Sequence, residues 1–313
     1  MPLNYSKAIT GSVFFQETKM SNSFQGKTAV ISGGAGGIGL ALAKELGRRG
    51  MRIVIGDIEK SQLLAAEQQL EELDIEVLAC ELDVTDFAQW QRLVEQATER
   101  FGKLHMLINN AGVGGIPGSI EKTDHKTWQW VVDVNLMGVV FGTQALTPAL
   151  KSHGEGGWII NVASMAGMGG VPYSGAYSAT KAAVVSLTEG WAVELKSHNI
   201  AVSVLCPAFV KTRIHESMRN IQDKYKNPAL SAPDGKSGSG MFNAGALVEA
   251  GIDPTILANR VCEALESGQT YIFTHPNYRQ AIQARSAAID SAFKDAENSP
   301  VVKHLIGQPI DIL

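Results

Sequence analysis

The chain has 313 residues, of which 45% are hydrophobic and 19% charged, and this balance favours a large α/β domain over a disordered chain. Its formal charge of -4, its sequence pI near 6.0 and the absence of any local run of Lys or Arg exclude the electrostatic footprint of a nucleic-acid-binding protein. We therefore expect small-molecule chemistry and no nucleic-acid partner.

Cysteine usage and hydropathy predict a cytoplasmic protein with no membrane partner. Cys80, Cys206 and Cys262 are widely spaced in apolar runs and form no Cys-x-x-Cys pair. Residues 1–19 lack the apolar core of a secretion signal, and no stretch approaches the roughly 18 consecutive apolar residues of a membrane span. The seven His form no His-x-x-x-His or similar set, so we expect no catalytic metal.

The first predicted strand, residues 28–31, leads into a glycine-rich turn and a helix. Five glycines lie within residues 32–39, and residues 40–46 follow a helical pattern. Such a turn lets the backbone approach a pyrophosphate and leaves the helix N-terminus free to attract it. The flanking strand and helix favour this interpretation over a merely flexible loop. The nucleotide-binding glycines would be Gly33, Gly37 and Gly39.

A second apolar strand, residues 52–56, ends on Asp57, about twenty residues past the glycine turn. The Asp57 carboxylate is placed to accept both ribose hydroxyls of an adenosine, and it would repel a 2′-phosphate. No Arg or Lys lies in the turn or at 58–59 to hold such a phosphate. The pattern favours NAD over NADP as cofactor; the alternative is an exposed acidic residue that merely follows a strand.

Strands and helices continue to alternate down the chain. This alternation predicts a doubly wound, mostly parallel Rossmann-type sheet with helices on both faces and ligands at its carboxyl edge. We expect helices over 61–73, 86–100 and 128–150, and strands over 75–82, 104–108, 157–163 and 200–206.

Two polar features stand out within these apolar segments. Asn109-Asn110-Ala111-Gly112 follows the strand at 104–108, and its amides either line the adenosine side of a cleft or only shape a turn. Asn135 lies inside the predicted helix 128–150 among apolar neighbours, where its amide needs hydrogen-bond partners. A neighbouring backbone segment is the simplest such partner.

Candidate acid–base chemistry follows the strand at 157–163. Tyr177 and Lys181 are four residues apart in a run without helix breakers, so they share one helix face. A phenol titrates near pH ~10, and a neighbouring ammonium lowers that pKa. Ser164, at the end of the strand, can hydrogen-bond the oxygen that Tyr177 protonates or deprotonates. A Tyr-x-x-x-Lys pair is common on helix surfaces, so a catalytic role for this pair is supported only if the other motifs also point to a site here.

The C-terminal part predicts a loop-rich insertion at 213–251, a helix over 253–266, a strand over 270–274 and an added amphipathic helix over 278–297. We expect one domain with this insertion near its C-terminus, divided as an N-terminal extension (1–23), a dinucleotide-binding catalytic domain (24–275) and a C-terminal extension (276–313).

Taken together, these motifs resemble the short-chain dehydrogenase/reductase superfamily over about residues 24–273. The resemblance includes the glycine turn, with Ser32 where Thr is more usual, and residues 207–212, with Ala208 where Gly is more usual. It implies NAD-dependent hydride transfer between a secondary alcohol and a ketone. The implied catalytic residues are Asn135, which holds a proton-relaying water, Ser164, which positions the substrate oxygen, Tyr177, which exchanges the hydroxyl proton, and Lys181, which lowers the Tyr177 pKa and holds the nicotinamide ribose.

The same resemblance implies a set of cofactor contacts along the carboxyl edge. Asp83 and Val84 would lie at the adenine, Ile38 at the pyrophosphate turn, and Val210 and Thr212 at the carboxamide. The full implied set is Gly33, Gly37, Ile38, Gly39, Asp57, Asp83, Val84, Asn110, Ala111, Gly112, Tyr177, Lys181, Val210 and Thr212, with no metal ligand.

The substrate is expected to be a bulky apolar or aromatic alcohol or ketone, because apolar and Met side chains flank the site. The extended tail is similar to that of dehydrogenases that oxidise the benzylic alcohol of lignin-derived aryl ethers. Alternatives are a 3-oxoacyl or hydroxysteroid-type reductase, an epimerase or dehydratase on the same fold, and a non-catalytic NAD-sensing protein. The expected pocket residues are Met165, Met168, Val171, Tyr173, Phe209, Met218, Met241 and Phe242.

Self-association is also expected. The predicted helices over 128–150 and 178–198 are too apolar to leave a face of each in water. We therefore predict a homodimer or homotetramer.

Overall fold

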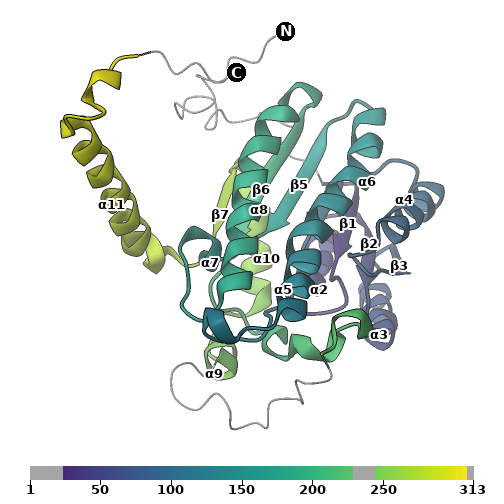
Figure 1. Ribbon diagram of the computed structural model, residues 1–313. Helices are drawn as coiled ribbons and strands as arrows, with labels where there is room; N and C mark the ends of the chain where they lie inside the picture. Colours follow the sequence, from purple (N-terminus) through teal and green to yellow (C-terminus); the bar gives the residue numbers. More distant parts are fainter. Residues whose placement is uncertain (1–23, 228–243, 309–313) are drawn as a thin grey trace. The chain divides into compact units, whose positions relative to one another are not determined.

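The computed structural model describes residues 24–227 and 244–308, which separate into two compact units. The first unit, residues 24–227 with 244–274, is built on one seven-stranded sheet in the order β3-β2-β1-β4-β5-β6-β7 (Figure 1). Every pair of neighbouring strands is parallel. The strands are β1 (Thr28–Ser32), β2 (Arg52–Asp57), β3 (Val77–Glu81), β4 (Met106–Asn109), β5 (Gly157–Val162), β6 (Ile200–Cys206) and β7 (Tyr271–Phe273).

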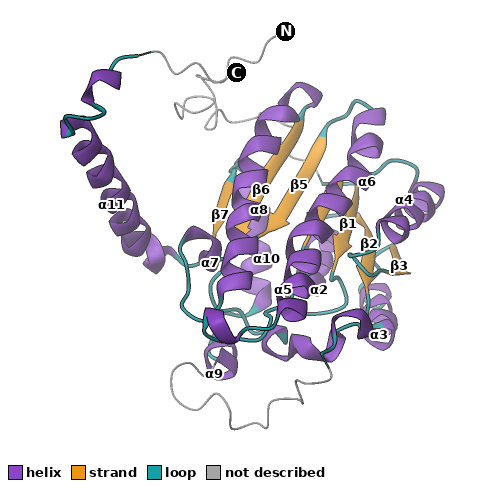
Figure 2. Cartoon of the chain, in the orientation of Figure 1, coloured by secondary structure: helices purple, strands orange, loops and turns teal. Residues whose placement is uncertain are grey.

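Helices cover both faces of this sheet (Figure 2). Successive strand side chains point to opposite faces, so Ala29 and Ile31 pack with α2, α3 and α10, whereas Val30 packs with α4, α5 and α6. The doubly wound α/β fold predicted from the alternation is confirmed. The helices of this unit are α2 (Gly37–Arg48), α3 (Lys60–Glu71), α4 (Phe87–Phe101), α5 (His125–Val132), α6 (Gly138–Ser152), α7 (Met165–Met168), α8 (Gly175–Glu194), α9 (Ala244–Glu249) and α10 (Pro254–Glu266).

The helix expected over 128–150 is interrupted by a π-helical turn at Asp133–Met137, between α5 and α6. A π turn carries one residue more than the α-helical ladder needs, and here it contains the fully buried Asn135. The Asn135 amide accepts from Val113 N at 2.8 Å and donates to Val113 O at 2.9 Å, so the loop after β4 supplies its partners. Poor helix propensity at Asn135 thus coincides with a real break in the helix.

The insertion expected at 213–251 is described in two parts. Residues 213–227 form two short 3-10 turns, Ile214–Asn220 and Asp223–Tyr225, and α9 follows at Ala244–Glu249. Met241 and Phe242 lie outside the described residues. Helix α10 begins as expected, since Asp253 caps it by accepting from Thr255 N at 2.8 Å.

The second unit comprises residues 275–308 and contains helix α11 (Arg279–Asn298). Every described side chain of α11 is exposed or only partly buried, including Ile289 and Phe293. Across the described parts of the chain, no helix combines the length and apolar character that crossing a membrane requires.

Candidate active site

The carboxyl edge of the sheet collects the predicted site residues. The strand order reverses direction between β1 and β4, and such a switch point opens a crevice between the two halves of a parallel sheet. The glycine turn leaves β1 at this point. Gly33 has φ +63°, and a Cβ there would lie 2.9 Å from the Asn110 amide nitrogen, so the turn closes against the loop after β4.

The N-terminus of α2 is free to bind an anion. Its cap residue is Gly36, which offers no side-chain hydrogen bond to the first backbone N–H groups of the helix. Gly39 packs directly on the turn, because a Cβ at Gly39 would lie 2.1 Å from Gly33 O. A Cβ at Gly37 would lie 3.1 Å from Thr212 Cγ2, so the turn also faces the segment after β6. These features suit a pyrophosphate at Gly33–Gly39.

Asp57 ends β2 beside the same turn. Its two carboxylate oxygens accept from Ala35 N at 3.1 Å and from Glu59 N at 3.0 Å, which orients the side chain without using all its lone pairs. Burial raises the pKa of Asp57, and the backbone hydrogen bonds oppose that rise. The carboxylate is therefore held in place and still able to accept hydroxyl groups.

Asn110 shapes the turn rather than projecting freely into the crevice. Its amide nitrogen donates to Ser32 O and Gly33 O, both at 2.9 Å. Ser32 Oγ in turn accepts from Asn110 N at 3.1 Å and from Ala111 N at 3.2 Å. Of the two interpretations open in the sequence, the described hydrogen bonds of Asn110 match the turn-shaping one, and Ser32 supplies the hydroxyl that this arrangement needs.

The loop after β4, the π turn and α8 meet at Gly112. A Cβ there would lie 3.3 Å from Asn135 Oδ1 and 3.5 Å from Lys181 Nζ. Glycine at this position therefore lets the three segments approach one another. Asn135 also donates from Nδ2 to Thr180 Oγ1 at 3.5 Å, which links the π turn to α8 directly.

Ser164, Tyr177 and Lys181 come together as predicted from their spacing. Ser164 caps α7, accepting from Ala166 N at 3.1 Å. Lys181 is buried, donates to Val162 O at 2.7 Å, and lies with its Nζ 5.7 Å from the centroid of the Tyr177 ring. The ammonium is thus near the phenol but anchored to the end of β5.

The electrostatics of this group differ from the expectation. Burial lowers the pKa of Lys181 to about 8. Burial also raises the pKa of Tyr177, and only a hydrogen bond from Ser164 opposes that rise. Desolvation of the phenol thus sets the direction of the Tyr177 pKa in this structure, and Lys181 is not among the groups that oppose the rise.

A pocket adjoins Tyr177, and its lining includes one of the eight expected pocket residues, Tyr173. Met165, Met168 and Met218 are partly buried against the core, and Val171 and Phe209 are exposed. Tyr173 has φ +63°, a strained conformation for a non-glycine residue that favours a role at a site. Three apolar lining residues that were not expected from the sequence come from the loop after β4 and from α5: Ile116, Trp128 and Val131.

Residues 207–212 lead from β6 along the same edge. Val210 forms a parallel bridge with Ile252, and its side chain is buried in the core. Ala208 is not among the residues with positive φ, so alanine serves in place of the more usual glycine. Thr212 is the residue of this run that approaches the glycine turn.

Residues 213–227, which we call the edge segment, run along the carboxyl edge of the sheet and form hydrogen bonds with residues at both ends of that edge. Arg219 forms two hydrogen bonds with Glu59 Oε1, at 2.6 and 3.1 Å, just beyond Asp57. Tyr225 OH donates to Asp133 Oδ2 at 2.7 Å at the other end. The segment thereby spans the edge from β2 to the π turn.

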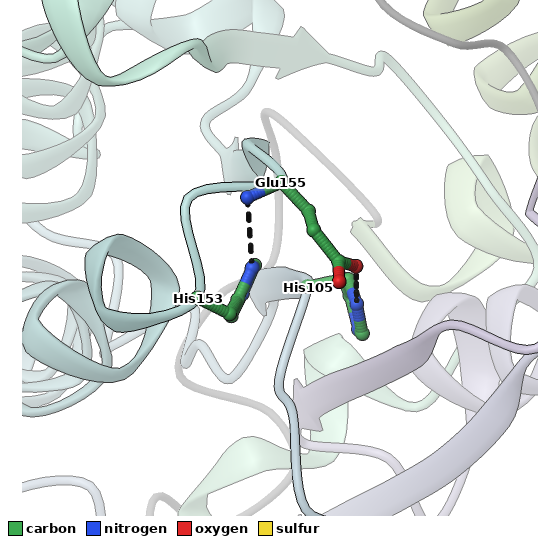
Figure 3. A group of neighbouring side chains, drawn as sticks. All are labelled: His105, His153 and Glu155. Carbon is green, nitrogen blue, oxygen red and sulfur yellow. Dashed lines mark hydrogen bonds and ion pairs between the residues drawn. The ribbon is translucent and has the colours of Figure 1, made fainter.

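A separate titratable group lies at the opposite, amino edge of the sheet (Figure 3). His105 Nδ1 accepts from Thr28 N at 3.1 Å, and its Nε2 bonds Glu155 Oε2 at 3.1 Å. His153 Nε2 donates to Leu104 O at 2.8 Å, and its Nδ1 accepts from Glu155 N at 3.2 Å. Both ring nitrogens of each histidine are thus engaged, which marks this trio as structural rather than as an open ligand set for a metal.

Comparison with known proteins matches most of the chain. Residues 27–223 match a family model described as short chain dehydrogenase. The chain is 34% identical to a CLA biosynthesis dehydrogenase/reductase of Lactiplantibacillus plantarum, over 84% of this chain and 92% of that protein. It is 32% identical to a C alpha-dehydrogenase of a Sphingobium species, over 88% and 90%. A crystal structure of a short chain dehydrogenase/reductase from Burkholderia phymatum in complex with NAD has a TM-score of 0.82 and 34% identity, over 86% and 96%.

Proposed function

From the premise that this chain belongs to the short-chain dehydrogenase/reductase family, we propose that it interconverts a secondary alcohol and a ketone with NAD. The observation that carries the proposal is the convergence of Ser164, Tyr177 and Lys181 beside a pocket at the carboxyl edge. The uncapped N-terminus of α2 and the oriented Asp57 carboxylate support a dinucleotide there.

In the proposed mechanism the substrate oxygen lies between two hydroxyl groups. Ser164 hydrogen-bonds that oxygen, and Tyr177 takes its proton during oxidation or returns one during reduction. Lys181, anchored on Val162 O, holds its charge near the phenolate as that charge develops. NAD, when bound, supplies the hydride-accepting carbon of the nicotinamide ring. Asn135 holds the loop at Val113 that flanks these side chains.

NAD is proposed over NADP because of Asp57. A 2′-phosphate beside this carboxylate would be repelled. The guanidinium groups of Arg213 and Arg219, which lie beside Glu59, are already paired with its carboxylate. The NAD complex of the structural relative is consistent with this preference.

The proposed substrate is bulky and apolar or aromatic. Trp128, Ile116 and Val131 give the pocket beside Tyr177 an apolar wall. Each Å² of apolar surface that a substrate buries there contributes about 25 cal/mol, so one phenyl ring is worth a few kcal/mol before ordering costs. The name of the Sphingobium relative, a C alpha-dehydrogenase, supports dehydrogenation of a substrate carbon as the reaction.

The test is an NADH absorbance assay on a substrate panel. We expect 1-phenylethanol and aryl-ether secondary alcohols to reduce NAD with higher kcat/KM than glycerol or sorbitol. The Tyr177→Phe variant is the matched control for background reduction. Equal or better efficiency on the polyols would contradict the substrate proposal, and no turnover on any alcohol or ketone would favour the non-catalytic alternative.

We further propose a cytoplasmic homo-oligomer. All three cysteines are buried and free of disulfides, which suits a reducing compartment. Small residues form an exposed stripe along α8 that lets a second copy approach closely: Ala179, Ala182, Ser186 and Gly190. Light scattering should give a dimer or tetramer at micromolar concentration, and a monomer there would contradict the proposal.

A further inference from the structure

The edge segment carries a buried amide beside Asp83. Gln222 Nε2 donates to Asp83 Oδ2 at 3.1 Å. The carboxylate only accepts hydrogen bonds, so the nitrogen of the amide must face Asp83 and the oxygen must be the other atom. Gln222 Oε1 is buried and has no hydrogen-bond partner among the described residues. An orphaned buried carbonyl is costly, and it points to a donor that a ligand supplies.

The surroundings of Gln222 are otherwise firmly fixed. Asp83 Oδ1 accepts from Thr85 N at 2.9 Å and from Thr85 Oγ1 at 2.8 Å, and Asp83 N donates to Gln89 Oε1 at 2.8 Å. The edge segment is held on both sides of Gln222, by Arg219 on Glu59 and by Lys224 on Thr85 Oγ1 at 3.1 Å. The unpaired oxygen is therefore held in a rigid frame and does not belong to a freely moving loop.

The unpaired polar atoms here are of the kinds that one edge of adenine would bind. The backbone N–H of Val84 has no acceptor among the described residues, and Gln222 Oε1 lies on the same amide group that bonds Asp83. The exocyclic amine of adenine has two hydrogens to donate, and the adjacent ring nitrogen accepts one. Asp83 and Gln222 Oε1 provide the two acceptors, and Val84 N–H provides the donor.

We propose that Gln222 is a further adenine-recognition residue, whose Oε1 accepts from the exocyclic amine while its Nε2 holds the Asp83 carboxylate. The inference rests on the proposed use of NAD. The edge segment begins beside Thr212, on the nicotinamide side of the proposed cofactor site. With Gln222 it would also contact the adenine at the opposite end of the dinucleotide. Recognition of adenine is then shared between the turn after β3 and a segment 139 residues later in the chain.

The test compares two dinucleotides by isothermal titration calorimetry. NADH is compared with reduced nicotinamide hypoxanthine dinucleotide, which has a carbonyl in place of the amine. In Gln222→Met, which keeps the side-chain length and removes the acceptor, the Kd for NADH should rise about 5-fold, the value of one neutral hydrogen bond. The Kd for the hypoxanthine dinucleotide should change less than about 2-fold, because that ligand has no amine to lose. Lys226→Met, which removes an exposed ammonium from the same segment, should leave both constants within about 2-fold.

Each other result would overturn the assignment. Equal weakening of both dinucleotides would mean that Gln222 only supports the segment. Tighter NADH binding in Gln222→Met would mean that the amide occupies the place of the adenine. If the unaltered chain bound neither dinucleotide, the proposed function would fail together with this inference, whereas binding without adenine selectivity would overturn the role of Gln222 alone.

Discussion

Titratable side chains lie at both edges of the sheet, but their hydrogen bonding and burial differ between the two edges. At the amino edge, His105, His153 and Glu155 engage both ring nitrogens of each histidine in hydrogen bonds. At the carboxyl edge, Lys181 and Tyr177 are desolvated, with their pKa values shifted by burial, and Gln222 keeps an unpaired oxygen. The titratable side chains of the amino edge thus pair with one another, whereas the carboxyl edge leaves hydrogen-bonding capacity for a ligand.

This contrast predicts opposite phenotypes for variants at the two edges. Carboxyl-edge variants should change turnover or cofactor binding with little change in unfolding. Amino-edge variants should change unfolding and leave turnover intact. A variant with the wrong phenotype for its edge would break the comparison.

The largest effect is expected for Tyr177→Phe. Only the exchangeable proton is lost, and the ring keeps its packing, so kcat should fall about 10²–10⁴-fold while NADH affinity changes less than about 2-fold. Steady-state kinetics and calorimetric titration with NADH measure the two quantities. Retention of a tenth of the original activity would refute Tyr177 as the proton donor.

Lys181→Ala should damage both turnover and cofactor binding. It removes a buried ammonium that donates to Val162 O and lies near Tyr177, so we expect kcat to fall about 100-fold and NADH affinity to weaken measurably. Lys181→Met is the matched control for lost side-chain volume. If the Met variant kept full activity, the charge would have no role, and the loss in the Ala variant would reflect packing alone.

An intermediate effect is expected at Asp57. The unaltered chain should use NAD with a kcat/KM at least about 30-fold above that for NADP, since a carboxylate repels the 2′-phosphate. Asp57→Asn should narrow this ratio by weakening NAD use and relieving the repulsion. Both cofactors are measured under identical conditions. Better use of NADP by the unaltered chain would contradict the assignment.

The smallest effect is expected for Glu155→Gln at the amino edge, as a loss of stability that is present at neutral pH and disappears in acid. Hydrogen bonds from Lys103 and His105 lower the pKa of Glu155 from its ordinary 4.5 to about 2. A carboxyl with a lowered pKa contributes stability above its ordinary pKa, and that contribution is lost as pH falls from about 4.5 towards 2. Urea midpoints should therefore fall less steeply over this range in Glu155→Gln than in the unaltered chain. Activity at neutral pH should be unchanged, and a parallel loss of turnover would show that the two edges are coupled.

Much of the fold and site could be predicted because its signals are local. The glycine turn, Asp57 at the end of β2, and the i,i+4 spacing of Tyr177 and Lys181 each lie within a short stretch of sequence. Asn135 was marked by its poor helix propensity, although the π turn around it was not predicted. Periodicity likewise located the parallel strands, because each is a short apolar run between turn residues.

What could not be predicted depends on contacts between distant parts of the chain. Gln222 meets Asp83 only because the edge segment crosses the sheet, and its sequence gives no signal of that path. His105 and His153 are 48 residues apart, so no spacing rule brings them together, yet their rings lie 4.8 Å apart. The Tyr177 pKa depends on distant contacts in a similar way: spacing identifies the neighbouring ammonium, whereas desolvation of the phenol depends on the whole surrounding fold.

The π turn at Asp133–Met137 limits how this region of the chain can change in length. Because a π turn contains one residue more than an α-helical ladder requires, deleting a single residue there would let α5 and α6 join as one regular helix, a change that local backbone energetics would favour. The same deletion would rotate one flank by about 100° relative to the other. Asn135 would then lose register with Val113 or with Thr180. A shortened helix would therefore be a more regular structure with a broken link to the loop after β4.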